Sequence, residues 1–186
     1  MIAGKLLSIG VTEGQFVASA GKWKTCTRYE RNNMAEKRIT LILPYLTELS
    51  VNHSHGQNRR GGRFLKPIVK TWGLLVKSGL NHFLPSLYKP EMLETPPFRL
   101  DVHVRFARKF GTKSGDAPNF DKVCRDFVAS ALEVDDVGTT GEPSSTFGWG
   151  KTLARIELNI TLFVREEHEN SFTDGVLHLT SQRAGE

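Results

Sequence analysis

The sequence predicts an α+β fold in which a small mixed or antiparallel sheet packs against two main helices. Residues 98–106 and 155–162 alternate apolar and polar side chains, and this period of two is typical of half-buried strands. Residues 64–80 and 119–132 instead place apolar side chains at helical spacing, which predicts two amphipathic helices. Because strands and helices alternate only loosely along the chain, separate layers of sheet and helix are expected.

Shorter signals define the remaining elements. Residues 38–43 form a mainly apolar run that Pro44 closes, so a short strand is expected there. Residues 50–63 read SVNHSHGQNRRGGR, which has no apolar period and predicts a glycine-rich basic loop. Residues 81–97 hold several prolines and predict a connector.

The chain divides into three parts on this pattern. An N-terminal arm covers residues 1–37, and the sequence leaves its order open. Within it, Met34 is an alternative start of translation, because the organised pattern begins only at residue 38. A single domain covers residues 38–164, and the polar tail over residues 165–186 is expected to fray.

Composition limits the classes of function. The 186 residues carry 25 Lys+Arg and 20 Asp+Glu, a net charge of +5, and the size suits one domain with a real core. Charged residues or proline interrupt every apolar run, which excludes a membrane-spanning segment, and no membrane partner is expected. The only cysteines, Cys26 and Cys124, can build neither a disulfide framework nor a cysteine zinc site. A reducing compartment, the cytoplasm, is therefore expected.

The second helix carries the most informative polar residues. Asn119, Lys122 and Asp126 stand at positions i, i+3 and i+7, so they share the helix face opposite the apolar stripe. An ordinary surface ion pair between Lys122 and Asp126, worth about 0.3–0.5 kcal/mol, would explain part of this pattern without any chemistry.

Three carboxylates flank that helix. Asp116 precedes its N-terminus, where backbone N–H groups stabilise an ionised carboxylate, and Asp135 and Asp136 follow its other end. A helix of this length spans about 20 Å, so its two ends share a metal ion only if the chain folds back or a second subunit supplies a carboxylate. The ordinary alternative is that Asp116 caps the helix and that Asp135 and Asp136 form a solvated turn.

The order of these features resembles the RusA family of Holliday junction resolvases, metal-dependent endonucleases common in bacteriophages and prophages. In that family the signature Asp-x-Asp-Asn-x-x-Lys-x-x-x-Asp opens a helix and an Asp-Asp pair follows. Asp135 and Asp136 match the pair with a small difference in length. The resemblance covers residues 38–164 and implies a RusA-like arrangement of sheet and helices. The residues that match the signature at the same spacing are Asp116, Asn119, Lys122 and Asp126.

The resemblance implies an active centre on the second helix. It assigns Asp116, Lys122 and Asp136 as catalytic residues, and Asp116, Asp135 and Asp136 as metal ligands. The expected ion is Mg²⁺, with Mn²⁺ able to substitute, because Mg²⁺ binds through one or two carboxylates together with substrate phosphate. The expected reaction is paired hydrolysis of phosphodiester bonds at a four-way DNA junction.

One position departs from the signature. Its second Asp falls on Pro118, whose side chain cannot bind a metal, so Asp121 and Asp126 are expected only as supporting residues. A junction-binding protein that does not cut therefore remains an alternative. A basic nucleic-acid interaction module, in which the acidic residues only cap helices, is a third hypothesis.

Basic residues cluster on both sides of the acidic segment, and binding to a phosphate backbone requires cations. His53 and His55 lack further Cys or His at zinc spacing, so contacts to phosphate or base, or simple solvation, are preferred to a zinc site. The residues expected to bind nucleic acid are Asn52, His53, Arg59, Arg60, Arg63, Lys66, Arg108, Lys109, Lys113 and Asn119.

The expected partners are branched DNA and a second copy of the chain. A four-way junction has two-fold symmetry, so paired cuts require two active sites, and the resemblance implies that a homodimer supplies them. The expected location is the cytoplasm of a bacterium or of a phage-infected host.

Overall fold

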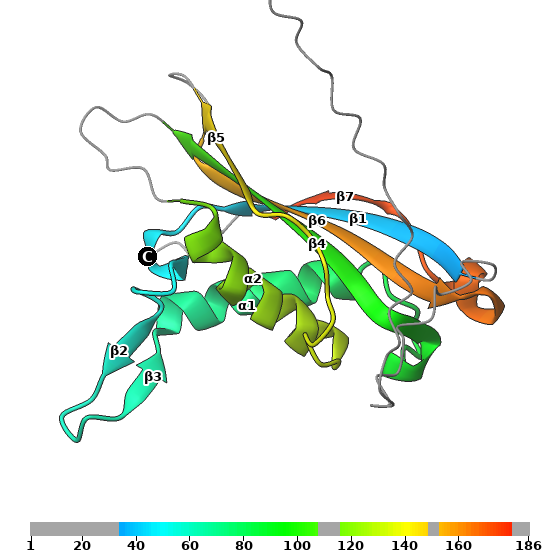
Figure 1. Cartoon of the computed structure of the whole chain (residues 1–186), viewed down its shortest axis with the longest axis horizontal. Helices are drawn as coiled ribbons and strands as arrows, with labels where there is room; N and C mark the ends of the chain where they lie inside the picture. The colour runs from blue at the N-terminus through cyan, green and yellow to red at the C-terminus, as the bar shows by residue number, and fades with distance from the viewer. Residues whose placement is uncertain (1–33, 108–115, 149–152, 180–186) are drawn as a thin grey trace, which may run out of the picture. The chain divides into compact units, whose positions relative to one another are not determined.

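The computed structural model describes residues 34–107, 116–148 and 153–179, and its centre is a five-stranded mixed sheet (Figure 1). The strand order is β5-β4-β6-β1-β7, and the central strand β6 runs antiparallel to both of its neighbours, β4 and β1. The two edge strands run parallel to their neighbours, β5 to β4 and β7 to β1. The predicted α+β class is therefore confirmed. The strands are β1 (Met34–Pro44), β4 (Leu93–Ala107), β5 (Ser144–Gly148), β6 (Arg155–Arg165) and β7 (Gly175–His178).

The alternation read from the sequence determines which face of the sheet is buried. Every second residue of β6 from Ile156 to Val164 is buried, and the residues between them are half-buried. The register places apolar partners opposite one another, with Ile160 between Ile39 of β1 and Leu100 of β4. The inward side chains of the three central strands therefore form one continuous apolar layer.

The helices α1 (Pro67–Asn81) and α2 (Pro118–Leu132) cover that layer and pack on each other (Figure 1). Pro67 and Pro118 occupy the first turn of their helices, where the absence of an N–H group costs no hydrogen bond. The Trp72 ring of α1 lies 5.9 Å from that of Phe127 of α2, and its indole N–H donates to the backbone oxygen of Pro44 at 2.9 Å. This contact joins both helices to β1.

Three details differ from the expectations over residues 50–97. The segment expected as an irregular loop contains the antiparallel hairpin β2 (His55–Gln57) and β3 (Arg63–Leu65), and a 3-10 turn, η1 (Thr47–Leu49), precedes it. Helix α1 begins at Pro67 rather than at residue 64, because β3 includes the residues before it. The expected connector contains η2 (Pro90–Met92) and the first residues of β4, which joins the sheet through an irregularity between Leu93 and Phe98.

Both ends of the expected domain extend further than predicted. Strand β1 begins at Met34, inside the expected arm, and its whole length pairs with β6. The segment expected to fray contains η3 (Glu166–Ser171) and β7, which pairs with residues 39–42 of β1. Expectations for residues 1–33 and 180–186 lie outside the described residues. None of the helices within the described ranges is long and apolar enough to cross a membrane.

The chain after α2 turns back toward the sheet. Glu133 takes a left-handed conformation, with φ of 55°, and its N–H caps the last turn of the helix. Gly141 has φ of 141°, and a Cβ atom there would lie 1.6 Å from the backbone oxygen of Leu100. Only glycine allows so close an approach to β4, and the approach leads the chain into β5.

Candidate functional site

The turn after α2 brings Asp136 back alongside the helix that it follows. Its carboxyl group lies close enough to that of Asp126, which is exposed on α2, to act on it through charge and hydrogen bonding. Lys122 lies one turn earlier on the same helix face, close enough for its charge to act on Asp126. The structure therefore brings together Lys122, Asp126 and Asp136.

The electrostatics of this group favour a cation. Although Asp126 as a residue is exposed, partial burial of its carboxyl group raises the pKa above its usual range, and the charge and hydrogen bonding of Asp136 raise it further. The Lys122 ammonium lowers this pKa but does not reverse the overall direction. Two neighbouring carboxylates repel each other when both are ionised, so a positive ion between them would relieve the repulsion.

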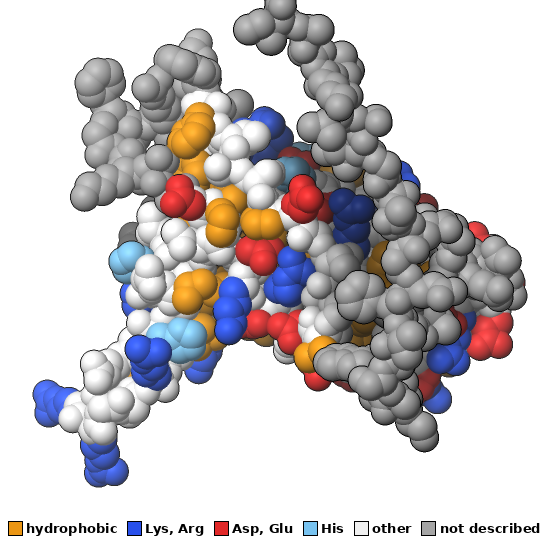
Figure 2. Space-filling model, in the orientation of Figure 1, with side chains coloured by type: hydrophobic (Ala, Val, Ile, Leu, Met, Phe, Trp, Pro, Cys, Tyr) orange, Lys and Arg blue, Asp and Glu red, His pale blue; other side chains and the backbone are white. Residues whose placement is uncertain are grey.

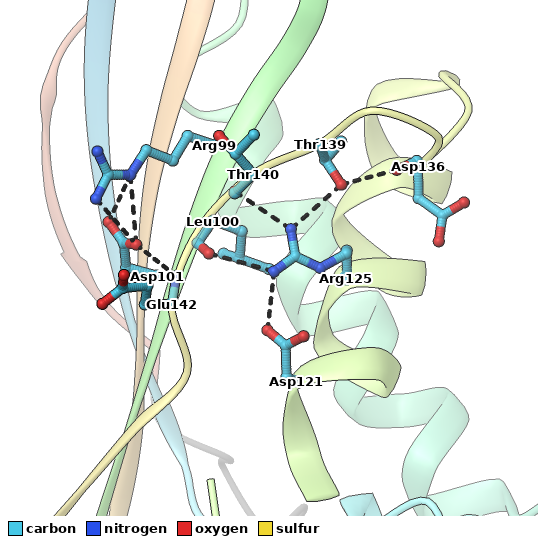
Figure 3. Close-up of polar contacts among 9 residues, drawn as sticks. All are labelled: Arg99, Leu100, Asp101, Asp121, Arg125, Asp136, Thr139, Thr140 and Glu142. Atoms are coloured by element: carbon cyan, nitrogen blue, oxygen red, sulfur yellow. Dashed lines mark hydrogen bonds and ion pairs between the residues drawn. The ribbon is translucent and has the colours of Figure 1, made fainter. Parts of the chain in front are cut away.

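Arg125 holds the turn that carries Asp136 (Figure 3). Its guanidinium donates to the Thr139 hydroxyl at 3.2 Å and to the backbone oxygen of Thr140 at 3.3 Å. The Thr139 hydroxyl in turn donates to the backbone oxygen of Asp136 at 2.8 Å. The other guanidinium nitrogen reaches the Leu100 oxygen of β4 at 3.5 Å, so helix, turn and sheet are tied through one side chain.

The remaining predicted acidic residues lie elsewhere. Asp116 is exposed ahead of α2, ten positions before Asp126, which corresponds to about 15 Å of rise along a helix. The Asp135 carboxylate accepts the N–H of Val137 at 3.1 Å and so stabilises the turn. Asp121 forms an ion pair with Arg125 at 3.0 Å. Across residues 34–107, 116–148 and 153–179, no group of three or more potential metal ligands occurs within one chain.

Of the three ordinary interpretations of the acidic residues, the structure disagrees with two and agrees with one. The N-cap of α2 is Ala117, whose side chain cannot cap, and Asn119 N–H bonds to the backbone oxygen of Asp116 rather than to its carboxylate. In the part of the chain that the structure describes, the i, i+4 ion pair of α2 joins Asp121 to Arg125, not Lys122 to Asp126. The solvated-turn interpretation fits Asp135, which is exposed.

A stretch of the chain without acidic residues runs through the hairpin and α1. No Asp or Glu occurs between Glu48 and Glu91, and no ion pair within the described ranges involves a cation of this stretch. Basic side chains project from the hairpin at the lower left of Figure 2. We call these residues the basic surface; its cations are Arg59, Arg60, Arg63, Lys66, Lys70, Lys77 and Lys89.

Helix α2 connects to this basic surface at its first turn. The backbone oxygen of Asn119 accepts the N–H of Val51 at 2.8 Å, just before the hairpin. Asn52 and His53 are both exposed in this loop. The predicted contacts at Arg108, Lys109 and Lys113 lie outside the described residues.

Two residues of the site were not anticipated from the sequence. Arg125 and Thr139 orient Asp136, although neither belongs to the signature. The spacing of Asp121 and Arg125 was a signal for their ion pair, but nothing in the sequence indicated that the guanidinium also reaches Thr139. The sequence matches no protein-family model, and it has no match among curated proteins.

Proposed function

We propose that this protein is a magnesium-dependent, structure-selective endodeoxyribonuclease that resolves four-way DNA junctions by paired hydrolysis of phosphodiester bonds. The observation that carries the proposal is the contact of the Asp126 and Asp136 carboxyl groups beside Lys122, on a chain that also carries the basic surface. A nuclease requires carboxylates for a metal ion and cations for the phosphate backbone.

The donor set fits Mg²⁺. This ion prefers oxygen ligands and needs only one or two carboxylates when it also binds substrate phosphate. Asp126 and Asp136 provide two neighbouring carboxyl groups, and burial together with the charge of Asp136 raises the pKa of Asp126 by more than Lys122 lowers it. When bound, the ion would supply an activated water and neutralise charge on the scissile phosphate.

The other residues act on the substrate. The Lys122 ammonium, on the same helix face, would bind the scissile phosphate and stabilise charge that develops on the leaving oxygen. Arg125, through Thr139, would keep the Asp136 carboxyl in place without itself touching the substrate. The basic surface would bind a duplex arm of the junction through its phosphates.

The proposal includes a homodimer in the cytoplasm. Two-fold symmetric junctions require two active sites for paired cuts, and a symmetric dimer supplies them. Within one chain, Asp116 lies far from Asp136 along α2. In a dimer, Asp116 or Asp135 of the second subunit would join the metal ligands instead.

A junction-binding protein that does not cut is the second candidate. Its support is Pro118, which begins α2 at the position where the RusA signature has an Asp. With a helix-starting proline there, one expected metal ligand is replaced by a residue that serves the fold.

The test is cleavage of a synthetic four-way junction by the full chain with Mg²⁺ or Mn²⁺. Symmetric nicks are expected from the parent protein, and Asp136→Asn should bind the junction without cutting it. Glu167→Gln, an exposed change in η3, is the matched loss of one acidic charge and should cut normally. If Asp136→Asn cuts as fast as the parent, the proposed site is wrong; binding without cutting by the parent selects the second candidate.

A further inference from the structure

A polar pocket opens where the β2–β3 hairpin meets the loop after η1. Its volume is about 360 Å³, and none of its lining residues belongs to the group of Lys122, Asp126 and Asp136. It is therefore a separate feature. The lining residues are Val51, Asn52, His55, Gly56, Gln57 and Arg63.

The lining is rich in hydrogen-bond donors. Asn52 and Gln57 contribute amide groups, His55 a ring nitrogen, and Arg63 a guanidinium. Among the described residues that line the pocket there is no carboxylate. Phosphate oxygens only accept hydrogen bonds, and a guanidinium can bind two of them at once, so this lining suits a phosphate group.

Ser54, which precedes the lining residue His55, is fully buried. The Ser54 hydroxyl lies 2.9 Å from Nδ1 of His55, and the backbone oxygen of Ser54 accepts the N–H of Lys66 at 3.0 Å. The ring of His55 is thus held through one nitrogen, which leaves Nε2 as the nitrogen available to a ligand. The N–H of Val51 is bound by Asn119, so the pocket is anchored to the first turn of α2.

The pairing of the hairpin places the donors on one face. Gln57 pairs with Arg63 and His55 with Leu65, and alternate strand residues share a face, so His55, Gln57 and Arg63 lie together. On the other face the Phe64 ring packs over Gly56, where a Cβ atom would lie 2.6 Å from the ring. This packing stiffens a hairpin of only two short strands.

We propose that the pocket is a phosphate subsite that receives a backbone phosphodiester of DNA. The phosphate chemistry follows from the lining; the choice of DNA over a free phosphate rests on the proposed function. Arg59 and Arg60, exposed at the turn of the hairpin, extend the positive charge beyond the pocket along the path of a bound strand.

The experiment measures junction binding by fluorescence anisotropy of the full chain in EDTA, so that no turnover is required. Arg63→Gln and His55→Gln are expected to weaken binding about tenfold, because each removes a charge-assisted or oriented donor to phosphate. Arg59→Gln removes the same charge at the turn of the hairpin, outside the pocket, and is expected to weaken binding only about two- to threefold. Unchanged amide NMR spectra outside the hairpin confirm that each variant folds.

A second arm replaces single DNA phosphates by neutral methylphosphonates. One of these linkages, at the phosphate that the pocket binds, should weaken binding to the parent. The same linkage should not weaken binding to Arg63→Gln any further. The proposal would be overturned if Arg63→Gln and Arg59→Gln weakened DNA binding equally and if every methylphosphonate that weakened binding to the parent also weakened binding to Arg63→Gln.

A third arm separates the two sources of phosphate. Inorganic phosphate and a deoxynucleoside monophosphate are titrated while the His55 ring signals are followed by NMR. If the His55 signals shift saturably with these anions while Arg63→Gln leaves DNA affinity unchanged, the assignment to DNA is overturned in favour of a free anion. Binding of DNA through Arg63 without cleavage would leave the subsite standing and contradict only the nuclease proposal.

Discussion

Arg125 of α2 donates a hydrogen bond to the Thr139 hydroxyl at 3.2 Å, across the turn that carries Asp136. The Arg125 side chain is only 14% exposed, and Asp121 neutralises its charge at 3.0 Å. The Arg125 guanidinium therefore helps to fix the position of the turn that carries Asp136.

Replacing Arg125 by methionine should destabilise the domain. The change leaves Asp121 without its partner and the oxygens of Leu100 and Thr140 without a donor, and losses of this kind cost about 2–4 kcal/mol. Urea unfolding at pH 7 measures the difference. Arg38→Met is the matched control, since Arg38 is 80% exposed and its pair with Glu36 should contribute less than about 1 kcal/mol. Similar losses in both variants would refute the role given to Arg125.

The Asp126→Asn variant should be more stable than the parent at pH 7. The folded-state pKa of Asp126 lies above the ordinary value of 3.8, so the folded protein binds the extra proton more tightly than the unfolded chain. Stability of the parent therefore falls as pH rises through the window between these two pKa values. Since Asp126 is solvent-exposed, screening limits the gain from Asn to less than about 1 kcal/mol.

The measurement for this variant is urea unfolding from pH 3 to pH 8. The stability advantage of Asp126→Asn should disappear below the unfolded-state pKa, where the Asp126 carboxyl of the parent is protonated in both the folded and the unfolded state. A difference from the parent that stays constant across this range would show that ionisation of Asp126 is not its cause.

Divalent cations should raise the melting temperature of the parent. Ligand that binds only the folded state at one hundred times its Kd stabilises by about 2.7 kcal/mol, which is several degrees for a domain of this size. Mn²⁺ or Mg²⁺ titration followed by thermal unfolding measures the shift. Asp136→Asn should abolish it and Glu167→Gln should retain it; a shift that survives Asp136→Asn would place the ion elsewhere.

Gly141→Ala should be among the most damaging single changes outside the core. The new Cβ atom would meet the Leu100 oxygen at 1.6 Å, so β4 and the chain after α2 must separate, at a cost of about 3 kcal/mol or more. Gly138→Ala is the control, because Gly138 also has positive φ, 84°, but no atom lies within 4 Å of the added carbon. Thermal unfolding should show a loss of only about 1–2 kcal/mol for Gly138→Ala.

The elements that the sequence predicted well are those that bury one face. Strand β6 and the second half of β4 alternate strictly because the core is on one side of them, and α2 has a complete apolar stripe for the same reason. The hairpin β2–β3 and the edge strand β5 have no such pattern, since neither has one face turned fully to the core. The partner strand of β5 lies far away in the sequence, and β2 pairs with β3 across a turn that contains glycine.

The sequence indicated the acidic residues of the candidate site, but neither their pairing nor the part played by Arg125 and Thr139. The sequence singled out Asp126 and Asp136, yet it favoured Asp116 as the partner of Asp136. The direction of the chain after α2 decides this question, and that direction depends on Glu133 at positive φ, on Gly141 against β4, and on the reach of Arg125. These are backbone and tertiary features that no side-chain spacing expresses.

The basic surface also has a kinetic consequence. Because no acidic side chain occurs from Leu49 to Pro90, the charge along the chain is uneven, and a polyanion approaching by diffusion would be steered toward the hairpin. Encounter rates should then drop steeply as ionic strength rises, while the lifetime of the complex, set by short-range contacts, should change much less.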